Sequence, residues 1–104
     1  MFSSDLGRLA ENIVFLELIR RGFEIYYWKG KKEVGFIAKK DGRNIAVNVC
    51  YTDMPAKREI ESLEEIRHID LQLDRYILIT KDSVVDAEGI YSIPLWQWLI
   101  MDEI

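Results

Sequence analysis

The sequence predicts an α/β protein with one mixed β-sheet and helices on both faces. Three observations support this fold class. Apolar residues recur at helical spacing before residue 22, aromatic and alternating segments follow over residues 23–51, and a continuous apolar run occupies residues 76–79 after the helical period has returned. The length of 104 residues is enough for one domain with its own core, so a single domain over residues 1–104 is expected.

A first helix is expected to begin where Ser3, Ser4 or Asp5 can cap it. Its apolar positions are three or four residues apart, and they are Leu6, Leu9, Ile13, Leu16 and Ile19, with Val14 and Phe15 widening the stripe. Gly22 can adopt the left-handed conformation that ends many helices. We therefore expect the helix to stop there.

Three strands are expected next, as an antiparallel meander. Residues 23–28 are aromatic and β-branched, residues 33–39 follow a basic turn, and residues 44–51 precede a change of period. Asp41 and Gly42 form a dipeptide that is typical of a tight hairpin turn, so the second and third strands should pair directly.

A second helix is expected after Pro55, with apolar residues at every third position over residues 60–66. Residues 75–80 predict a strand buried on both faces, residues 89–94 a last strand, and residues 95–101 a closing helix. The expected order is α-β-β-β-α-β-β-α. A β-α-β crossover makes the fourth strand parallel to the third. In the closing helix, both tryptophans are expected to pack on the sheet.

Composition excludes several classes of protein. A single cysteine excludes an internal disulfide, and a single histidine, His68, with no Cys/His cluster argues against a metal centre. No apolar run approaches the ~20 residues of a membrane span, and no secretory signal pattern is present. No Gly-x-x-x-x-Gly-Lys-Ser/Thr loop is present, so no ATP binding is expected. We expect a cytoplasmic protein without a membrane partner, and many Lys, Glu and Ile favour a thermophilic source.

Charge is divided unevenly along the chain. Residues 1–60 hold 11 Lys/Arg and 8 Asp/Glu, a net charge of +3, whereas residues 61–104 hold 3 and 10, a net charge of −7, which together give −4. A basic half can face nucleic-acid phosphate. The candidate nucleic-acid-binding residues are Arg20, Arg21, Trp28, Lys29, Lys31, Lys32, Lys39, Lys40 and Arg43. A solvated surface and self-association between the two halves are the alternatives.

Two facing alternations are the most informative pattern. Glu33 and Gly35 share a face of one expected strand, and Asn48 and Cys50 share a face of the next. Several stretches resemble the C-terminal restriction-endonuclease-like domain of archaeal AAA-type ATPases, a member of the PD-(D/E)xK superfamily. The similar stretches are residues 7–18, 22–28, 32–36, 47–51 and 93–99.

The resemblance implies a nuclease fold in which acids and a lysine surround Mg²⁺. Glu11 stands at the position of the helix acid, whereas Gly35, Asn48 and Cys50 stand where the family carries two strand acids and the lysine. The acids would hold the metal and the lysine would neutralise developing charge. Glu33, two residues from Gly35 on the same face, can take over the role of the strand acid that Gly35 replaces. These five are the candidate residues of a vestigial catalytic site.

The sequence therefore predicts a catalytically degenerate nuclease-fold domain that acts as a protein- or nucleic-acid-interaction module. The alternative is a weakly active or divergent metal-dependent nuclease, and only this alternative would need Mg²⁺. Simpler interpretations stay open for single residues. Glu11 can be a polar position of the helix, Asn48 a hydrogen-bonded sheet residue and Cys50 a small core residue.

Overall fold

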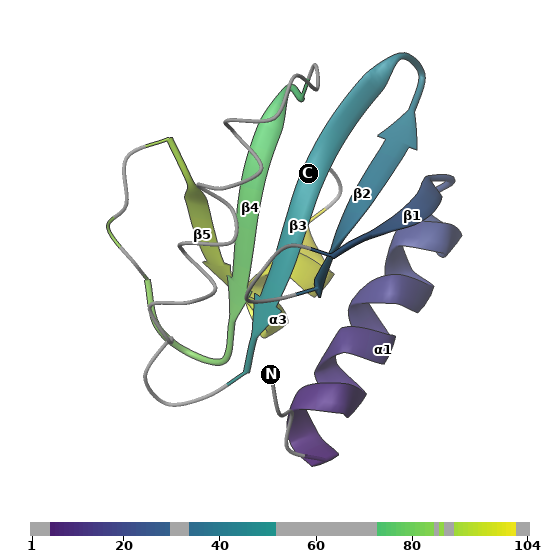
Figure 1. Ribbon diagram of the computed structural model, residues 1–104. Helices are drawn as coiled ribbons and strands as arrows, with labels where there is room; N and C mark the ends of the chain where they lie inside the picture. The colour runs from purple at the N-terminus through teal and green to yellow at the C-terminus, as the bar shows by residue number, and fades with distance from the viewer. Residues whose placement is uncertain (1–4, 30–33, 52–72, 85, 87–88, 102–104) are drawn as a thin grey trace.

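The computed structural model describes residues 5–29, 34–51, 73–84, 86 and 89–101 (Figure 1). The elements are α1 (Asp5–Arg20), β1 (Glu24–Lys29), β2 (Val34–Lys40), β3 (Arg43–Cys50), β4 (Arg75–Thr80), β5 (Tyr91–Pro94) and α3 (Leu95–Ile100). The mixed α/β class is confirmed. The helix expected after Pro55 falls within residues 52–72 and lies outside the described part of the chain.

The five strands form one mixed sheet in the order β1-β2-β3-β4-β5. The β1–β2 and β2–β3 pairs are antiparallel, and the β3–β4 and β4–β5 pairs are parallel. The predicted meander and the predicted parallel fourth strand are both confirmed. Asp41 and Gly42 connect β2 to β3 with φ angles of 51° and 79°. A two-residue hairpin turn of type I′ requires positive φ at both positions, which is why this dipeptide predicts it.

Gly22 ends α1 as predicted. Its φ is 92°, its N–H donates to the carbonyl of Ile19 at 2.9 Å, and the N–H of Phe23 donates to the carbonyl of Leu18 at 3.0 Å. These two bonds are the pair that defines a Schellman motif. The chain therefore turns sharply out of α1 and enters β1 at the edge of the sheet.

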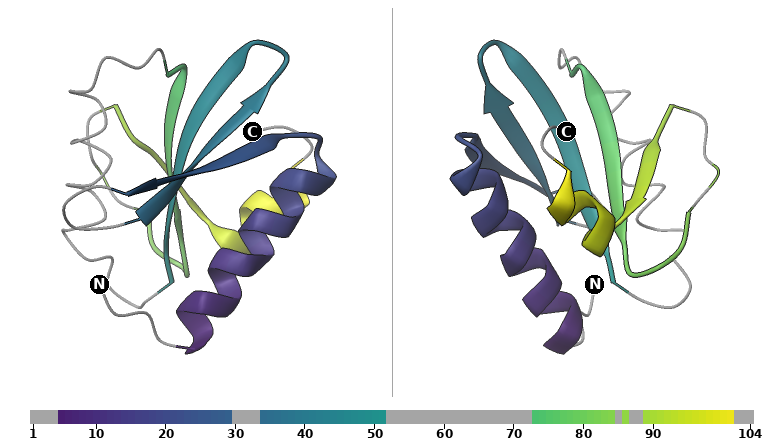
Figure 2. Two further views of the ribbon diagram at one scale, coloured as in Figure 1. Left: turned by 45° about the vertical axis from the view of Figure 1, so that its right-hand side comes forward. Right: turned by 180° about the vertical axis from the view of Figure 1, so that it is seen from behind.

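The main core lies between one face of the sheet and the two described helices. Figure 2 shows α1 and α3 on the same side of the sheet. The helices contribute Ala10, Val14, Leu18, Leu95 and Trp98 to this core. A smaller cluster on the opposite face contains Ile37, Ala46, Cys50, Leu78 and Ile90. Strands β3 and β4 are thus buried on both faces. Neither described helix has the length and hydropathy needed to cross a bilayer.

Two expectations about the helices are wrong in detail. The closing helix buries Trp98 fully but leaves Trp96 59% exposed, because residues two apart on a helix point to nearly opposite sides. Helix α1 buries the line through Ala10 and Val14, whereas most of the apolar stripe expected from the sequence faces outward. The exposed members of that stripe are Leu6, Leu9, Leu16 and Ile19.

Candidate functional site

Gly35 of β2 and Asn48 of β3 meet at the centre of the candidate site. Phe36 pairs with Val47 in the β2–β3 ladder, so Gly35 and Asn48 are the next opposed positions. A Cβ atom on Gly35 would overlap Oδ1 of Asn48 and would lie 3.1 Å from its Cγ. The amide of Asn48 therefore fills the space in which a side chain at position 35 would lie.

Asn48 is held in the interior as a neutral group. It is 3% exposed, and within the described residues its Nδ2 has no hydrogen-bond partner. An unpaired buried amide costs free energy, about 1–3 kcal/mol. A carboxylate in the same place would cost more, since burying an unpaired charge is worse than burying an unpaired dipole. The environment therefore suits an amide better than an acid.

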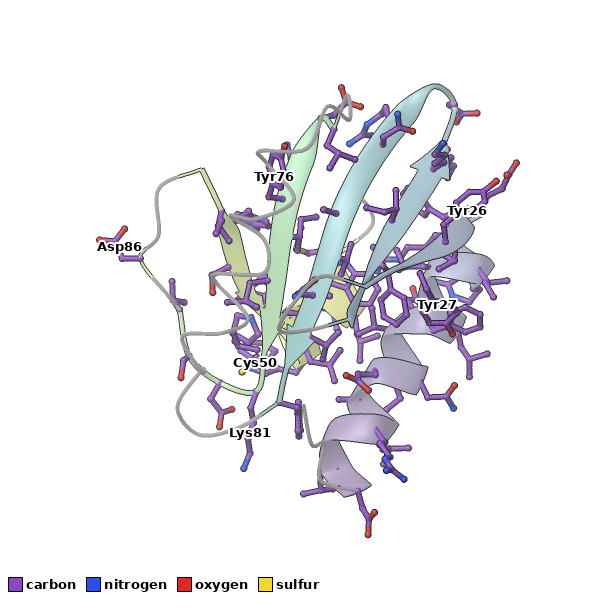
Figure 3. The ribbon with its side chains drawn as sticks, in the orientation of Figure 1. Tyr26, Tyr27, Cys50, Tyr76, Lys81 and Asp86 are labelled. Carbon is purple, nitrogen blue, oxygen red and sulfur yellow. The ribbon has the colours of Figure 1, made fainter. Side chains whose placement is uncertain are left out.

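Cys50 lies on the same face as Asn48, two residues further along β3. It is the last residue of that strand, and Figure 3 shows it at the same end of the sheet as Lys81. The cysteine is 3% exposed and packs in the smaller cluster with Ala46 and Leu78. Its thiol is free of disulfide bonding. The position that the resemblance assigns to a lysine is thus part of a hydrophobic core.

Glu11 lies over the other face of the sheet. Helix α1 packs on the face that carries Phe36 and Val47, and these residues alternate with Gly35 and Asn48 along their strands. Glu11 lines a small cavity of about 80 Å³ whose walls are Tyr27, Gly35, Phe36, Val47 and Val49. Gly35 is the link, because it lines this cavity on one side and contacts Asn48 on the other.

The predicted site residues are therefore brought together only in part. Gly35 adjoins both Glu11 and Asn48, while Asn48 and Cys50 do not line the cavity of Glu11. Glu33 lies outside the described residues. Within the described part of the chain, no group of three or more His, Cys, Asp or Glu residues can hold a metal ion. The donors near Gly35 are one carboxylate, one amide and one thiol on two faces, and they do not fit Mg²⁺, which needs several oxygen ligands in octahedral array.

The basic residues divide between two ends of the sheet. Lys39, Lys40 and Arg43 flank the β2–β3 turn and are exposed. Lys39 Nζ lies 5.2 Å from the ring centroid of Tyr26, and Lys40 Nζ donates to the carbonyl of Arg21 at 2.6 Å. Lys39, Lys40 and Arg43 outnumber Asp41, the acid of the turn, and aromatic rings lie beside the charges, so this is called the cationic end.

Lys29 belongs to the opposite end. It pairs with Val34, whereas Glu24 at the start of β1 pairs with Lys39. Lys31 and Lys32 lie outside the described residues, and so does the side chain of Trp28, although its backbone is part of β1. The predicted set is thus not one continuous surface.

Arg20 and Arg21 are neighbours in sequence with different surroundings. The Arg20 side chain is 71% exposed and pairs with Glu17, whereas the Arg21 side chain is only 8% exposed. Arg21 donates from Nη2 to the carbonyls of Trp98 and Met101 at 2.9 and 2.8 Å, and its guanidinium lies 4.6 Å from the Trp98 ring centroid. Arg21 fastens α3 to α1, which leaves little of it available to phosphate.

Glu17 was not predicted as a site residue, yet it binds both arginines at the end of α1. It accepts hydrogen bonds from Arg20 at 2.8 and 2.6 Å and from Arg21 at 2.7 Å. The hydrogen bonds from Arg20 are the largest cause, and with the hydrogen bond from Arg21 and the charges of both they lower the pKa of Glu17 from 4.5 to about 2, although burial, the second-largest effect, opposes them. The signal in the sequence was the i,i+3 and i,i+4 spacing of an acid and two arginines.

A shallow groove at the start of β4 and β5 was also not predicted. Its volume is about 520 Å³, and its lining residues are Asp74, Arg75, Tyr76, Gly89, Ile90 and Tyr91. Arg75 Cζ lies 5.9 Å from the ring centroid of Tyr91. The N–H of Asp74 donates to the carbonyl of Asn44 at 2.7 Å, so the groove adjoins the β2–β3 turn. The starts of two neighbouring parallel strands create it, and no local motif indicated it.

These features define a mixed α/β domain in which the Asn48 amide fills the space beside Gly35 and the β2–β3 turn forms a cationic end of the sheet. The chain belongs to the family described as "Domain of unknown function (DUF4143)", which matches residues 6–98. It is 36% identical to "Uncharacterized protein MJ1544" of Methanocaldococcus jannaschii and 35% identical to an uncharacterized protein of Haemophilus influenzae, each over 93% of this chain. The chain spans about a quarter of the length of these relatives (25% and 24%). No solved structure gives a significant match.

Proposed function

We propose that this chain is a restriction-endonuclease-like domain of the PD-(D/E)xK superfamily that has lost catalysis and serves as an interaction module in an ATPase system. Two observations support the setting. The sheet combines an antiparallel meander with a parallel fourth strand, and the family is often found as a C-terminal domain of AAA-type ATPases. The loss of catalysis is carried by one observation, which is the Asn48 amide in the space above Gly35.

The physical argument concerns charge at the reacting phosphate. An acid at position 35 cannot be accommodated until Asn48 moves, and the thiol of Cys50 is buried in an apolar cluster. Loss of one transition-state charge donor costs about 3–4 kcal/mol, or 10²–10³ in rate. Because a metal-binding acid and the lysine are both replaced, cleavage falls to a negligible rate.

A cleavage assay tests this proposal. The purified chain is incubated with Mg²⁺ or Mn²⁺ and with linear, circular and single-stranded DNA and with RNA, beside a Glu11→Ala variant prepared in parallel. We expect no product above the background that both proteins share. Metal-dependent cleavage that disappears in Glu11→Ala would establish the weakly active nuclease instead.

A second function, nucleic-acid binding, is favoured by the cationic end of the sheet. Lys39 and Arg43 flank the β2–β3 turn, and Arg75 and Tyr91 line the adjoining groove. Lysine and arginine bind phosphate, and an exposed tyrosine can stack on a base. The Tyr91 side chain is 42% exposed, so its ring is accessible at the surface.

Fluorescence anisotropy with a labelled single-stranded oligonucleotide tests this second function. Removal of two charges by Lys39→Gln and Arg43→Gln should weaken binding about tenfold or more and reduce the salt dependence, by ~0.7 in slope per lost phosphate contact. The matched control is Arg8→Gln with Lys81→Gln, which removes the same charge at positions outside the turn and the groove. Equal weakening by both pairs would show that only net charge matters, and binding that is insensitive to salt would exclude the function.

A further inference from the structure

The outer face of α1 carries four exposed apolar side chains among polar ones, although it packs against nothing in the described structure. Leu6, Leu9, Leu16 and Ile19 are 59%, 54%, 57% and 48% exposed. The opposite side of the helix already supplies Ala10, Val14 and Leu18 to the core, so these four side chains are not needed to hold α1 on the sheet. Exposed apolar residues that gather on one face, rather than scatter singly, indicate an interaction surface.

The size of this face matches a protein interface. Helix α3 lies beside α1 in the same layer (Figure 2) and adds exposed Trp96, Leu99 and Ile100. From the exposed fractions of the seven side chains, the apolar surface amounts to roughly 700 Å² per molecule, against the ~800 Å² that each partner contributes to an interface of standard size. This face can therefore supply most of the apolar area of a standard interface.

The order of residues along α1 is complementary to itself when reversed. Leu9 and Leu16 lie at equal distances from the midpoint of the helix between Asn12 and Ile13, and so do Leu6 and Ile19. The charged ends have the same relation, since Asp5 lies in the first turn and Arg20 in the last turn. A two-fold axis at the midpoint would convert each member of a pair into the other, as an isologous interface requires.

We propose that this face binds a second copy of the chain, with the two α1 helices antiparallel across a two-fold axis near Asn12. Leu9 then lies opposite the partner's Leu16, and Leu6 and the partner's Ile19 lie at one level on the flanks. Asp5 comes to the level of the partner's Arg20, so opposite charges meet at both ends. The helix dipoles are also opposed, which favours this orientation.

The dimer names one partner for the interaction module proposed above. The dimer proposal can be wrong while the proposed loss of catalysis is right, because the mass of the particle and the cleavage of nucleic acid are measured separately. A monomer that does not cut would overturn the dimer and leave the proposed function, whereas a dimer that cuts would do the reverse.

Sedimentation equilibrium of the whole chain measures the mass directly. We expect twice the 12.3 kDa of one chain at micromolar concentration, and a dissociation constant raised at least about a hundredfold in Leu16→Glu, because each substitution occurs twice in the interface. The control is Val84→Glu, which places the same charge at a side chain that is 76% exposed outside α1. A monomer at several hundred micromolar, or a dimer that Leu16→Glu leaves intact, would overturn the proposal.

Disulfide cross-linking tests the orientation and does not depend on how Leu16→Glu folds. Under mild oxidation, Asn12→Cys should form a covalent dimer, since the two positions lie beside the axis. Asp5→Cys should not, because two such positions are about 22 Å apart at 1.5 Å per residue. The native Cys50 is buried and should stay silent in both proteins. Efficient cross-linking through Asp5→Cys, or none through Asn12→Cys, would contradict the antiparallel arrangement.

Discussion

The amide of Asn48 occupies the place where a side chain at Gly35 would begin. A Cβ atom there would overlap Oδ1 of Asn48 and would lie 3.3 Å from the carbonyl oxygen of Val47. The Val47 carbonyl belongs to the β3 backbone, and the Asn48 side chain is buried, so room for a Cβ atom requires that side chain to leave its position. Glycine at 35 and asparagine at 48 are thus one structural unit rather than two separate substitutions.

A double-mutant cycle tests this dependence. Gly35→Ala should lower the free energy of unfolding by about 1–3 kcal/mol, because overpacking of a close-packed interior is costly. Asn48→Ala removes the obstructing amide, so the double variant should recover most of the loss from Gly35→Ala. Urea denaturation of all four proteins gives the coupling energy. Strictly additive losses would mean that the two residues do not compete for space.

Local patterns predicted the elements of the fold well, because each depended on a few adjacent residues. The bounds of β4 at Arg75–Thr80, the turn at Asp41 and Gly42 and the helix stop at Gly22 all follow from residue types whose backbone preferences are strong. The composition of the site was also visible, in that Gly35 and Asn48 were expected to face each other.

Relations across the chain could not be predicted in the same way. Helical spacing shows that α1 has apolar faces, but it does not say which one meets the sheet, and the apolar residues of α1 exceed what one face can bury. The place of Glu11 on the face opposite Asn48 follows from that choice. Arg21 at a helix end suits solvent as well as the interior, and its partners, Trp98 and Met101, lie 77 and 80 residues away.

The two adjacent arginines give a prediction about stability. Arg21→Ala should lower the free energy of unfolding by about 2–4 kcal/mol, because it removes hydrogen bonds to two α3 carbonyls and the contact with the Trp98 ring. Arg20→Ala is the matched control and should cost less, since it removes only the exposed pairing with Glu17 and no contact with α3. Denaturation followed by tryptophan fluorescence measures both. Equal losses would show that Arg21 does not fasten α3.

Glu17 should make the stability depend on pH in the acid range. Its pKa in the folded chain is about 2, against 4.5 for an ordinary glutamate, because Arg20 and Arg21 donate to it. The unfolded state therefore takes up the proton first, so the stabilisation is complete above about pH 5 and is lost as the pH falls toward 2. Glu17→Gln should flatten this part of the curve of unfolding free energy against pH. A carboxyl titration by NMR gives the pKa directly, and a midpoint near 4.5 would contradict the prediction.

Cys50 should react with thiol reagents only when the domain opens. The residue is 3% exposed and packs with Ala46 and Leu78 in the cluster on the face opposite α1, and a thiol must be accessible as thiolate to react. We expect labelling by a disulfide reagent to be at least about a hundredfold slower in buffer than in denaturing urea, since reaction in buffer requires local or global unfolding. The variant Val84→Cys supplies an exposed thiol as the internal standard, because residue 84 is 76% exposed. Labelling of Cys50 at the rate of that standard would show that this end of β3 is open to solvent and that Cys50 is not part of the core.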